Sequence, residues 1–220
     1  ITELSQMRSG YTKPITPEIT KLTGITADMV AGHKIDLAEV ESILGGGLLV
    51  IAHNAAFDRP HAERLSSAFA KCPWACSQSQ IDWQAEDFEG SKLCYLAMGA
   101  GFFYDRHRAV NDCHAAIELL SRRLPVSGQL GLAALLDCAR KPTRRINAFG
   151  SPFETKDILK VRGYRWDGDA KVWWTDAPEA DAEAELEWLR AEIYRHPGRE
   201  IPSKRITAMD RFSDRAGRAA

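Results

Sequence analysis

Two short stretches of the sequence carry side chains that could do chemistry: HNAAFD at residues 53–58 and HRAVND at residues 107–112. Each ends in a carboxylate near the expected start of a helix, and the second also begins with an imidazole. Carboxylates suit Mg²⁺ or Mn²⁺, which are hard cations that prefer oxygen ligands. A neutral imidazole nearby can take a proton from an attacking water. These residue types predict metal-dependent hydrolysis of phosphodiesters, with two metal ions at the attacking and leaving oxygens.

The spacing in the second stretch places its two functional side chains on different kinds of structure. Five residues correspond to about 500° of helical rotation, so His107 and Asp112 could not share one helix face. We therefore expect His107 on a loop and a helix that begins near Asn111, a good N-cap residue. An apolar stripe would anchor this helix to the core. Its expected members are Cys113, Ala116, Ile117, Leu120 and Leu124.

The first stretch follows an expected strand. Residues 48–52, LLVIA, form a continuous apolar run after three glycines, which is typical of a central strand buried on both faces. Pro60 is tolerated in the first turn of a helix, so we expect a helix to begin close to Asp58, with Ala62, Leu65 and Phe69 on its apolar stripe. Asp58 would then lie where the strand passes into the helix.

With these motifs, the sequence resembles the DEDDh 3'-to-5' exonucleases, a family that includes the proofreading epsilon subunit of bacterial DNA polymerase III. HNAAFD resembles the second motif of the family and HRAVND the third, while LTGIT at residues 22–26 resembles a loop near the substrate's 3' end. The resemblance covers about residues 12–125. It implies Asp58 and Asp112 as metal ligands, His107 as general base, and a ribonuclease H-like α/β fold.

The resemblance also implies the ligands of the protein. The cofactor would be Mg²⁺ or Mn²⁺, in a two-metal site when the first motif is present. The substrate would be nucleic acid with a 3' end, DNA in preference to RNA, and a DNA polymerase or a repair complex is a candidate partner. The expected substrate-binding residues are Gly24, Ile25, Thr26, His53, Asn54 and Phe57. Asn54 could instead simply close a turn after the strand.

One feature of the family is missing from the sequence. The first motif of the family is an Asp-x-Glu pair on an opening strand, and no such strand precedes residue 48. Asp87-Phe88-Glu89 follows the second motif in a polar loop, and Asp181-Ala182-Glu183 lies in an expected helix, where positions two apart diverge by about 200°. Glu3 lacks an Asp two residues earlier. We therefore expect an N-terminally truncated chain that lacks its first strands, is less stable, and is weakly active or inactive.

Each motif residue also has a purely structural interpretation. Asp58 could be a helix cap, Asp112 a first-turn acid favoured by the helix dipole, and His107 a surface loop residue. The nuclease interpretation is preferred because strand, loop and helix are expected in the right places for all three residues together. The aromatic residues 102–104, just before His107, are expected to fill the core rather than to stack on bases.

Composition is that of an ordinary soluble protein. The 220 residues are 45% hydrophobic with a formal net charge of −1, so no global positive charge attracts nucleic acid. No apolar run is long enough to cross a membrane and no signal peptide is evident, so we expect a cytoplasmic protein without membrane contact. Cys72 and Cys76 could ligate zinc, but no second closely spaced pair completes a tetrahedral site, and reduced thiols are preferred.

The second half of the chain predicts a separate module. We expect the exonuclease domain over residues 1–139, a basic linker over 140–146, a small α/β module over 147–198 and a basic, partly disordered tail over 199–220. The module would contain a helix over 153–162, a hairpin across 167–169 and a helix over 179–195 whose buried stripe is Ala182, Leu186, Leu189 and Ile193.

Cations and tryptophans of this module could contact nucleic acid as an accessory site. The candidate cations are Lys160, Arg162, Arg165 and Lys171. Because so small a module needs large apolar groups for a core, Trp166 and one of Trp173 and Trp174 are expected to be buried. Two functions therefore remain open for the chain: a 3'-to-5' exonuclease, or a non-catalytic scaffold of the same fold that binds nucleic-acid ends or a polymerase.

Overall fold

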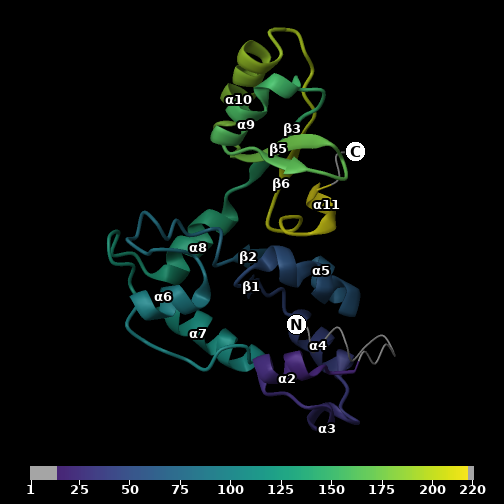
Figure 1. The fold of residues 1–220 in the computed structure, drawn as a ribbon, viewed down its shortest axis with the longest axis vertical. Coiled ribbons are helices and arrows are strands. Elements are labelled where there is room, and N and C mark those ends of the chain that lie inside the picture. Colours follow the sequence, from purple (N-terminus) through teal and green to yellow (C-terminus); the bar gives the residue numbers. More distant parts are fainter. Residues whose placement is uncertain (1–13, 218–220) are drawn as a thin grey trace. The chain divides into compact units, whose positions relative to one another are not determined.

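In the computed structural model, which describes residues 14–217, the chain forms two compact units that meet in sequence at Ala139 and Arg140 (Figure 1). Glu3 lies outside the described residues, as does any strand ahead of residue 14. No helix in the described part has both the length and the apolar character needed to cross a membrane.

The first unit opens with three short helices. They are α2 (Pro17–Thr23), α3 (Ala27–Val30) and α4 (Leu37–Leu44). Thr16 caps α2 through its side chain, and Gly24 ends the helix in the left-handed conformation, with φ at 68°. Asp36 caps α4 by accepting two backbone N–H groups. These caps explain why such short segments are helical, because each satisfies groups that a helix end leaves unpaired.

Two parallel strands precede and follow the segment that carries Asp58. β1 (Val50–Ala52) pairs with β2 (Trp74–Cys76), and they are joined by α5 (Ala55–Leu65) and η1 (Ser67–Lys71). The strand expected over residues 48–52 is present, but the prediction that it is central and spans all five residues is wrong in the described part of the chain. β1 is three residues long and has one neighbouring strand there, and Ile51 is 37% exposed. With a single neighbour, only one edge of the strand is paired.

The helix after β1 also begins earlier than predicted. α5 starts at Ala55, three residues before Asp58, and Pro60 lies inside it. Pro60 has no N–H to donate to the carbonyl of Ala56, so the helix lacks that hydrogen bond and continues without it.

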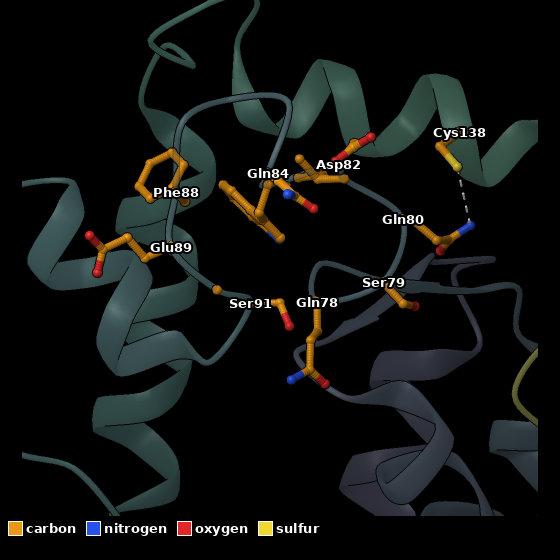
Figure 2. Close-up of a pocket in the computed structure, with 12 residues that line it drawn as sticks. Gln78, Ser79, Gln80, Asp82, Gln84, Phe88, Glu89, Ser91 and Cys138 are labelled. Atoms are coloured by element: carbon orange, nitrogen blue, oxygen red, sulfur yellow. Dashed lines mark hydrogen bonds between the residues drawn. The ribbon is translucent and has the colours of Figure 1, made fainter. Parts of the chain in front are cut away.

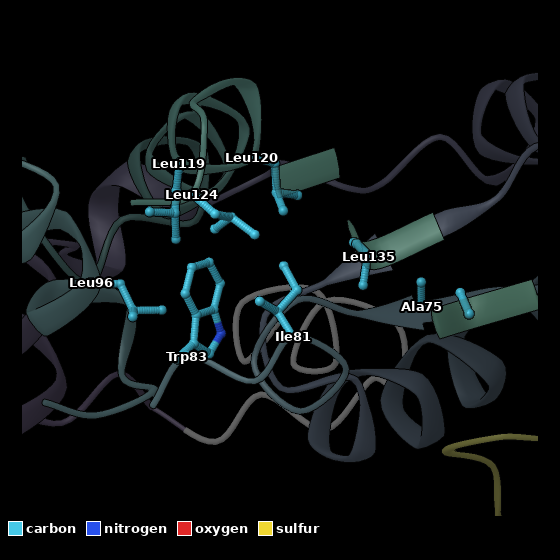
Figure 3. Packing of buried hydrophobic residues seen from close by; sticks show 9 residues of the cluster. Ala75, Ile81, Trp83, Leu96, Leu119, Leu120, Leu124 and Leu135 are labelled. Atoms are coloured by element: carbon cyan, nitrogen blue, oxygen red, sulfur yellow. The ribbon is translucent and has the colours of Figure 1, made fainter. Parts of the chain in front are cut away.

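Helices α6 (Leu93–Gly99), α7 (Ala109–Ser121) and α8 (Gly131–Arg140) surround the core of the first unit. Figure 3 shows the Trp83 indole among the buried aliphatic side chains of this core. The predicted stripe of α7 is rotated in the structure: its buried residues are Ala115, Leu119 and Leu120, whereas Ile117 is 65% exposed. The helix begins at Ala109 with Arg108 as N-cap, so Asn111 is inside it rather than at its start.

The second unit is a four-stranded antiparallel sheet with helices packed on it. Its strands are β3 (Thr143–Ala148), β4 (Arg165–Asp167), β5 (Val172–Pro178) and β6 (Ser203–Ile206), in the order β4-β5-β3-β6. Its helical segments are η2 (Phe153–Thr155), α9 (Lys156–Val161), α10 (Ala182–Trp188), η3 (Leu189–Ile193) and α11 (Asp214–Gly217). The hairpin across 167–169 and the four buried residues of the last long helical segment agree with the sequence prediction.

Three predictions for this unit are wrong. Most of the expected linker is strand β3, which pairs with both β5 and β6 at the centre of the sheet. The tail predicted to be partly disordered contains β6 and α11, and Ile206 and Ala216 are buried. Trp166 is 53% exposed rather than buried. The sequence did not predict β3 and β6 as strands because their arginines gave these segments the composition of a solvated linker.

Candidate active site

The first candidate carboxylate lies in the first turn of α5. After β1, Asn54 adopts a left-handed backbone with φ at 100°, and its carbonyl accepts the N–H groups of Phe57 and Asp58. Asn is one of the few residues with a side chain that tolerate this conformation. The turn therefore redirects the chain from the strand into the helix within one residue, and it places Asp58 next to the carboxyl end of β1.

Asp58 is half-buried without a compensating cation. Burial raises the pKa of its carboxyl to about 6, against a smaller lowering by His61. The neighbouring Arg59 is fully buried and bonds Glu63 at 2.7 Å. No ion pair joins Asp58 to a basic side chain of the described residues. A bound cation would stabilise the charged form of this partly buried carboxylate.

The second carboxylate lies in the first turn of α7. The backbone N–H of Asp112 bonds the carbonyl of Arg108 at 2.9 Å, which fixes this residue on the helix. His107 precedes the helix on an exposed bend with φ at 68°, as the spacing predicted. Its ring makes no hydrogen bond to the described residues, so the imidazole is available to move toward Asp112 or toward a ligand.

Two side chains respond to the charge of the candidate carboxylates. Burial raises the pKa of the Cys113 thiol, and the negative charges of both Asp112 and Asp58 raise it further. One side chain therefore senses both carboxylates. Burial also raises the pKa of Tyr104, with added contributions from the charge of Asp112 and a hydrogen bond to it. The sequence predicted Tyr104, with residues 102 and 103, to fill the core; no spacing rule predicted its bond to Asp112, because Tyr104 lies on an irregular loop.

His53 joins the end of β1 to the loop that follows β2. Its Nε2 lies 2.8 Å from the carbonyl of Ser91, to which it must donate, and its Nδ1 lies 2.9 Å from the Ser77 hydroxyl. Burial lowers the pKa of the His53 imidazole, despite the opposing effects of the Ser91 carbonyl and Asp112. A neutral ring then accepts the Ser77 hydroxyl hydrogen at Nδ1. Both ring nitrogens are engaged, and a direct contact of His53 with substrate stays a prediction.

The predicted substrate loop lies beside the third motif. The Arg108 guanidinium donates to the Gly24 carbonyl at 3.3 Å, so the structure brings the LTGIT and HRAVND segments together. Gly24 has a positive φ, and a Cβ there would lie 3.0 Å from Arg108 Nη2. Ile25 is buried and therefore packs in the core, whereas Thr26 is exposed. Of the three loop residues, Gly24 and Thr26 are accessible to a ligand.

Three further predicted or aromatic residues are exposed near the motifs. Asn54 makes no side-chain hydrogen bond at the helix start, and Phe57 is 49% exposed with its ring 4.7 Å from that of His61. On the loop before His107, Phe102 packs against the core, as predicted, but Phe103 is 82% exposed. Apolar rings with open faces are able to stack on bases.

The described residues contain the two candidate metal ligands. Asp58 and Asp112 offer hard oxygen donors on two rigid helix starts, which suits Mg²⁺ or Mn²⁺. Within residues 14–217, however, no three His, Cys, Asp or Glu side chains are grouped so that they could hold a metal ion. Of the two alternative Asp-x-Glu tripeptides, one lies on the loop after β2 and the other lies at the start of α10 in the second unit.

The cations predicted to contact nucleic acid differ in the structure. Arg162 pairs with Glu185 at 2.9 Å and stacks on Trp188 at 4.0 Å, so its charge is committed. Arg165 lies 5.4 Å from the Trp174 ring. Lys160 and Lys171 are exposed and form no ion pair with the described residues. An accessory contact with nucleic acid stays a prediction, and the two lysines are its best candidates.

The first unit is thus a mixed α/β domain with its two candidate carboxylates in the first turns of α5 and α7. A family model described as Exonuclease, RNase_T, matches residues 3–120, more than half of the chain. The chain belongs to this exonuclease family. Membership supports nuclease activity on nucleic acid and agrees with a ribonuclease H-like fold. No curated protein and no solved structure matches the chain significantly.

Proposed function

We propose that the protein is a metal-dependent 3'-to-5' exonuclease that removes nucleotides from the 3' end of nucleic acid, with DNA preferred to RNA. The observation that carries the proposal is the match of the exonuclease family model to residues 3–120, a range that contains both carboxylate motifs. The resemblance to proofreading enzymes supports both the direction of cleavage and the preference for DNA. It also supports a DNA polymerase or a repair complex as a partner.

Each residue of the two motifs has a role in this proposal. Asp58 and Asp112 hold Mg²⁺ or Mn²⁺, which would polarise the phosphodiester and favour a hydroxide at neutral pH. His107 takes the proton of the attacking water, and its exposed loop position allows it to approach the scissile phosphate. Asn54, Phe57, Gly24 and Thr26 surround the strand end.

A second function is favoured by one specific observation. Residues 14–217 lack a group of three metal-ligating side chains, and two carboxylates alone are few for two dications. The alternative is a non-catalytic protein of the same fold that binds nucleic-acid ends or a polymerase. The two functions differ in one measurable property, since only the enzyme shortens a bound strand.

The experiment compares hydrolysis with binding. A 5'-labelled DNA with a 3' overhang and a matched RNA are incubated with Mg²⁺ or Mn²⁺ and with the wild-type chain, His107→Ala or the matched control His196→Ala. His196 is an exposed histidine of the second unit. Stepwise shortening that is lost only in His107→Ala supports the exonuclease. Titration of Mn²⁺, followed by its electron paramagnetic resonance signal, reports the metal site independently of turnover.

Two outcomes would contradict the proposal. Tight binding of strand ends without shortening, together with no difference in Mn²⁺ binding between wild type and Asp58→Asn, would favour the scaffold. Shortening from the 5' end would retain a nuclease but reject the proposed direction.

A further inference from the structure

A pocket open to solvent lies at the carboxyl end of β2. It has a volume of about 750 Å³ and is lined by residues 78–84 and 88–91 of the loop after β2, with Cys138 of α8 on its wall (Figure 2). Pockets that bind small ligands commonly have volumes of about 300–1,000 Å³. The space is therefore sufficient for a nucleoside.

Two side-chain amide groups at the pocket form no hydrogen bond with the described chain. Gln78 and Gln84 line it, and their side chains make no hydrogen bond to the described residues. Gln80, by contrast, accepts the N–H of Cys76 at 2.8 Å and is committed to the fold. A primary amide offers a donor and an acceptor side by side, the pattern that pairs with the polar edge of a nucleobase.

The charges of the lining indicate which part of a nucleotide would enter. Asp82 and Glu89 line the pocket, and none of its lining residues is a lysine or an arginine. A phosphate would therefore be repelled, whereas an uncharged heterocycle with amino or imino donors would be accepted. Phe88 adds an aromatic wall, held edge-on by Trp83 with ring centroids 5.3 Å apart. An aromatic wall favours a flat ring.

The loop is fixed at both ends by a residue of the second motif. His53 bonds Ser77 at one end of the loop and Ser91 at the other, and Trp83 Nε1 donates to the Ser77 carbonyl at 2.8 Å. These bonds hold the pocket in shape before a ligand arrives, which lowers the entropic cost of binding. β1 and β2 are parallel, so the pocket and Asp58 follow carboxyl ends at the same sheet edge, where α/β proteins commonly bind ligands.

From this geometry we infer that the pocket binds an uncharged nucleobase of the strand whose end is held at Asp58 and Asp112. The inference rests on the proposed function for the identity of the strand. It adds a base-binding site to the phosphodiester site. His53 connects the two, because it belongs to the HNAAFD motif and bonds the pocket loop. Such a site would give the enzyme a preference among bases.

Nucleoside binding to the whole chain tests this inference without metal or turnover. Adenosine, guanosine, cytidine, thymidine and their 5'-monophosphates are titrated into ¹⁵N-labelled protein, and the indole N–H signal of Trp83 is assigned with Trp83→Phe. We expect a saturable shift of this signal with at least one nucleoside, and weaker binding of the corresponding monophosphate. The double variant Gln78→Ala/Gln84→Ala should bind about tenfold more weakly, because it loses two neutral hydrogen bonds.

The control is Gln129→Ala, which changes a glutamine of the same unit that bonds Asp137 outside the pocket. Its nucleoside affinity should equal that of wild type. The absence of a saturable Trp83 shift, or an equal loss in the control, overturns the inference. Circular dichroism verifies folding, and the single variants replace the double one if it unfolds. A chain that binds nucleosides but hydrolyses nothing retains the pocket and loses the proposed function, whereas a nuclease that binds no nucleoside does the opposite.

Discussion

The candidate carboxylates of the first unit differ in their pairing from an arginine of the second unit. In the second unit, Arg145 makes two hydrogen bonds of 2.7 and 2.8 Å to Asp176 and stacks on Trp174 at 4.1 Å. In the first unit, Asp58 and Asp112 are half-buried and form no ion pair with the described residues. Paired charges cost little once both partners are satisfied, whereas an unpaired buried carboxylate raises the free energy of the folded state.

We interpret the paired charges as structural and the unpaired carboxylates as functional. The arginines of the second unit stabilise a small sheet, and their partners leave little charge for an external ligand. The unpaired carboxylates of the first unit would be retained only if their charge acts on something that binds from outside. From composition alone the opposite assignment looked reasonable, because arginines next to tryptophans are also typical of nucleic-acid contacts.

The largest expected effect is on hydrolysis. In a preparation that shows exonuclease activity, His107→Ala should lower kcat by about 10²–10⁴-fold, because a general base contributes a factor of that size. Asp112→Asn should abolish measurable activity at the same metal concentration. Gel-based kinetics at several Mg²⁺ concentrations check both variants. Rescue of Asp112→Asn but not of His107→Ala by excess metal would distinguish a ligand from a base, and identical behaviour of the two variants would contradict the assigned roles.

Stability should change in opposite directions when a carboxylate is neutralised in each unit. Burial raises the pKa of Asp58 to about 6, so the folded state binds the proton more tightly than the unfolded state, and stability falls as pH rises from about 4 to 6. Asp58→Asn should therefore raise the free energy of unfolding at pH 7 by about 1–2 kcal/mol, after allowing for partial exposure. Below pH 4 the gain should disappear.

Asp176→Asn is the matched change in the second unit. It weakens a bidentate ion pair to Arg145 and should lower the free energy of unfolding by about 1–2 kcal/mol. Urea unfolding of the whole chain, followed with probes in each unit, measures both variants. Stabilisation by both substitutions, or destabilisation by both, would remove the distinction between the two kinds of charge.

Local sequence signals predicted the kinds of element around the site better than their bounds. Thr16, Gly24 and Asp36 lie at helix ends, where the backbone hydrogen bonding depends on a few neighbouring residues. The five-residue spacing of His107 and Asp112 correctly separated loop from helix. These features are local, so the residues that decide them are close together in the sequence.

The parts that could not be predicted depend on distant partners. Tyr104 reaches Asp112 only because the loop before α7 folds back, and His53 meets Ser91 across 38 positions of sequence. The burial pattern of α7 was wrong because contacts with distant residues of the core, such as Trp83 and Leu135, select the face that contains Leu119 and Leu120. β3 was missed because its arginines are paired by Asp176 and Glu179 on neighbouring elements, a compensation that composition does not reveal.

A further prediction concerns His53. Its ring is partly buried and hydrogen-bonded within the fold, whereas His107 is exposed. His53→Ala removes bonds to Ser77 and Ser91 and leaves a buried hole, which should cost about 2–3 kcal/mol. Because burial lowers the pKa of His53 from 6.5, the unfolded state binds its proton more readily, and wild-type stability should fall as pH drops below about 6.5. Urea unfolding at pH 5.5 and 7.5 should show this loss in wild type and a smaller loss in His53→Ala.

The smallest expected effect lies in the second unit. Lys160 and Lys171 are exposed without ion-pair partners in the described chain, whereas Arg162 is held by Glu185. If this unit contacts the strand, each lysine neutralises about one phosphate, so Lys160→Ala and Lys171→Ala should each reduce the slope of log affinity against log salt by about 1. Binding of a single-stranded DNA is measured by fluorescence anisotropy between low and moderate salt. Arg162→Ala should leave the slope unchanged, because its charge is already neutralised within the fold. An equal change of slope in all three variants would show that the ion pair with Glu185 opens on binding, and no change in any of them would confine nucleic-acid contact to the first unit.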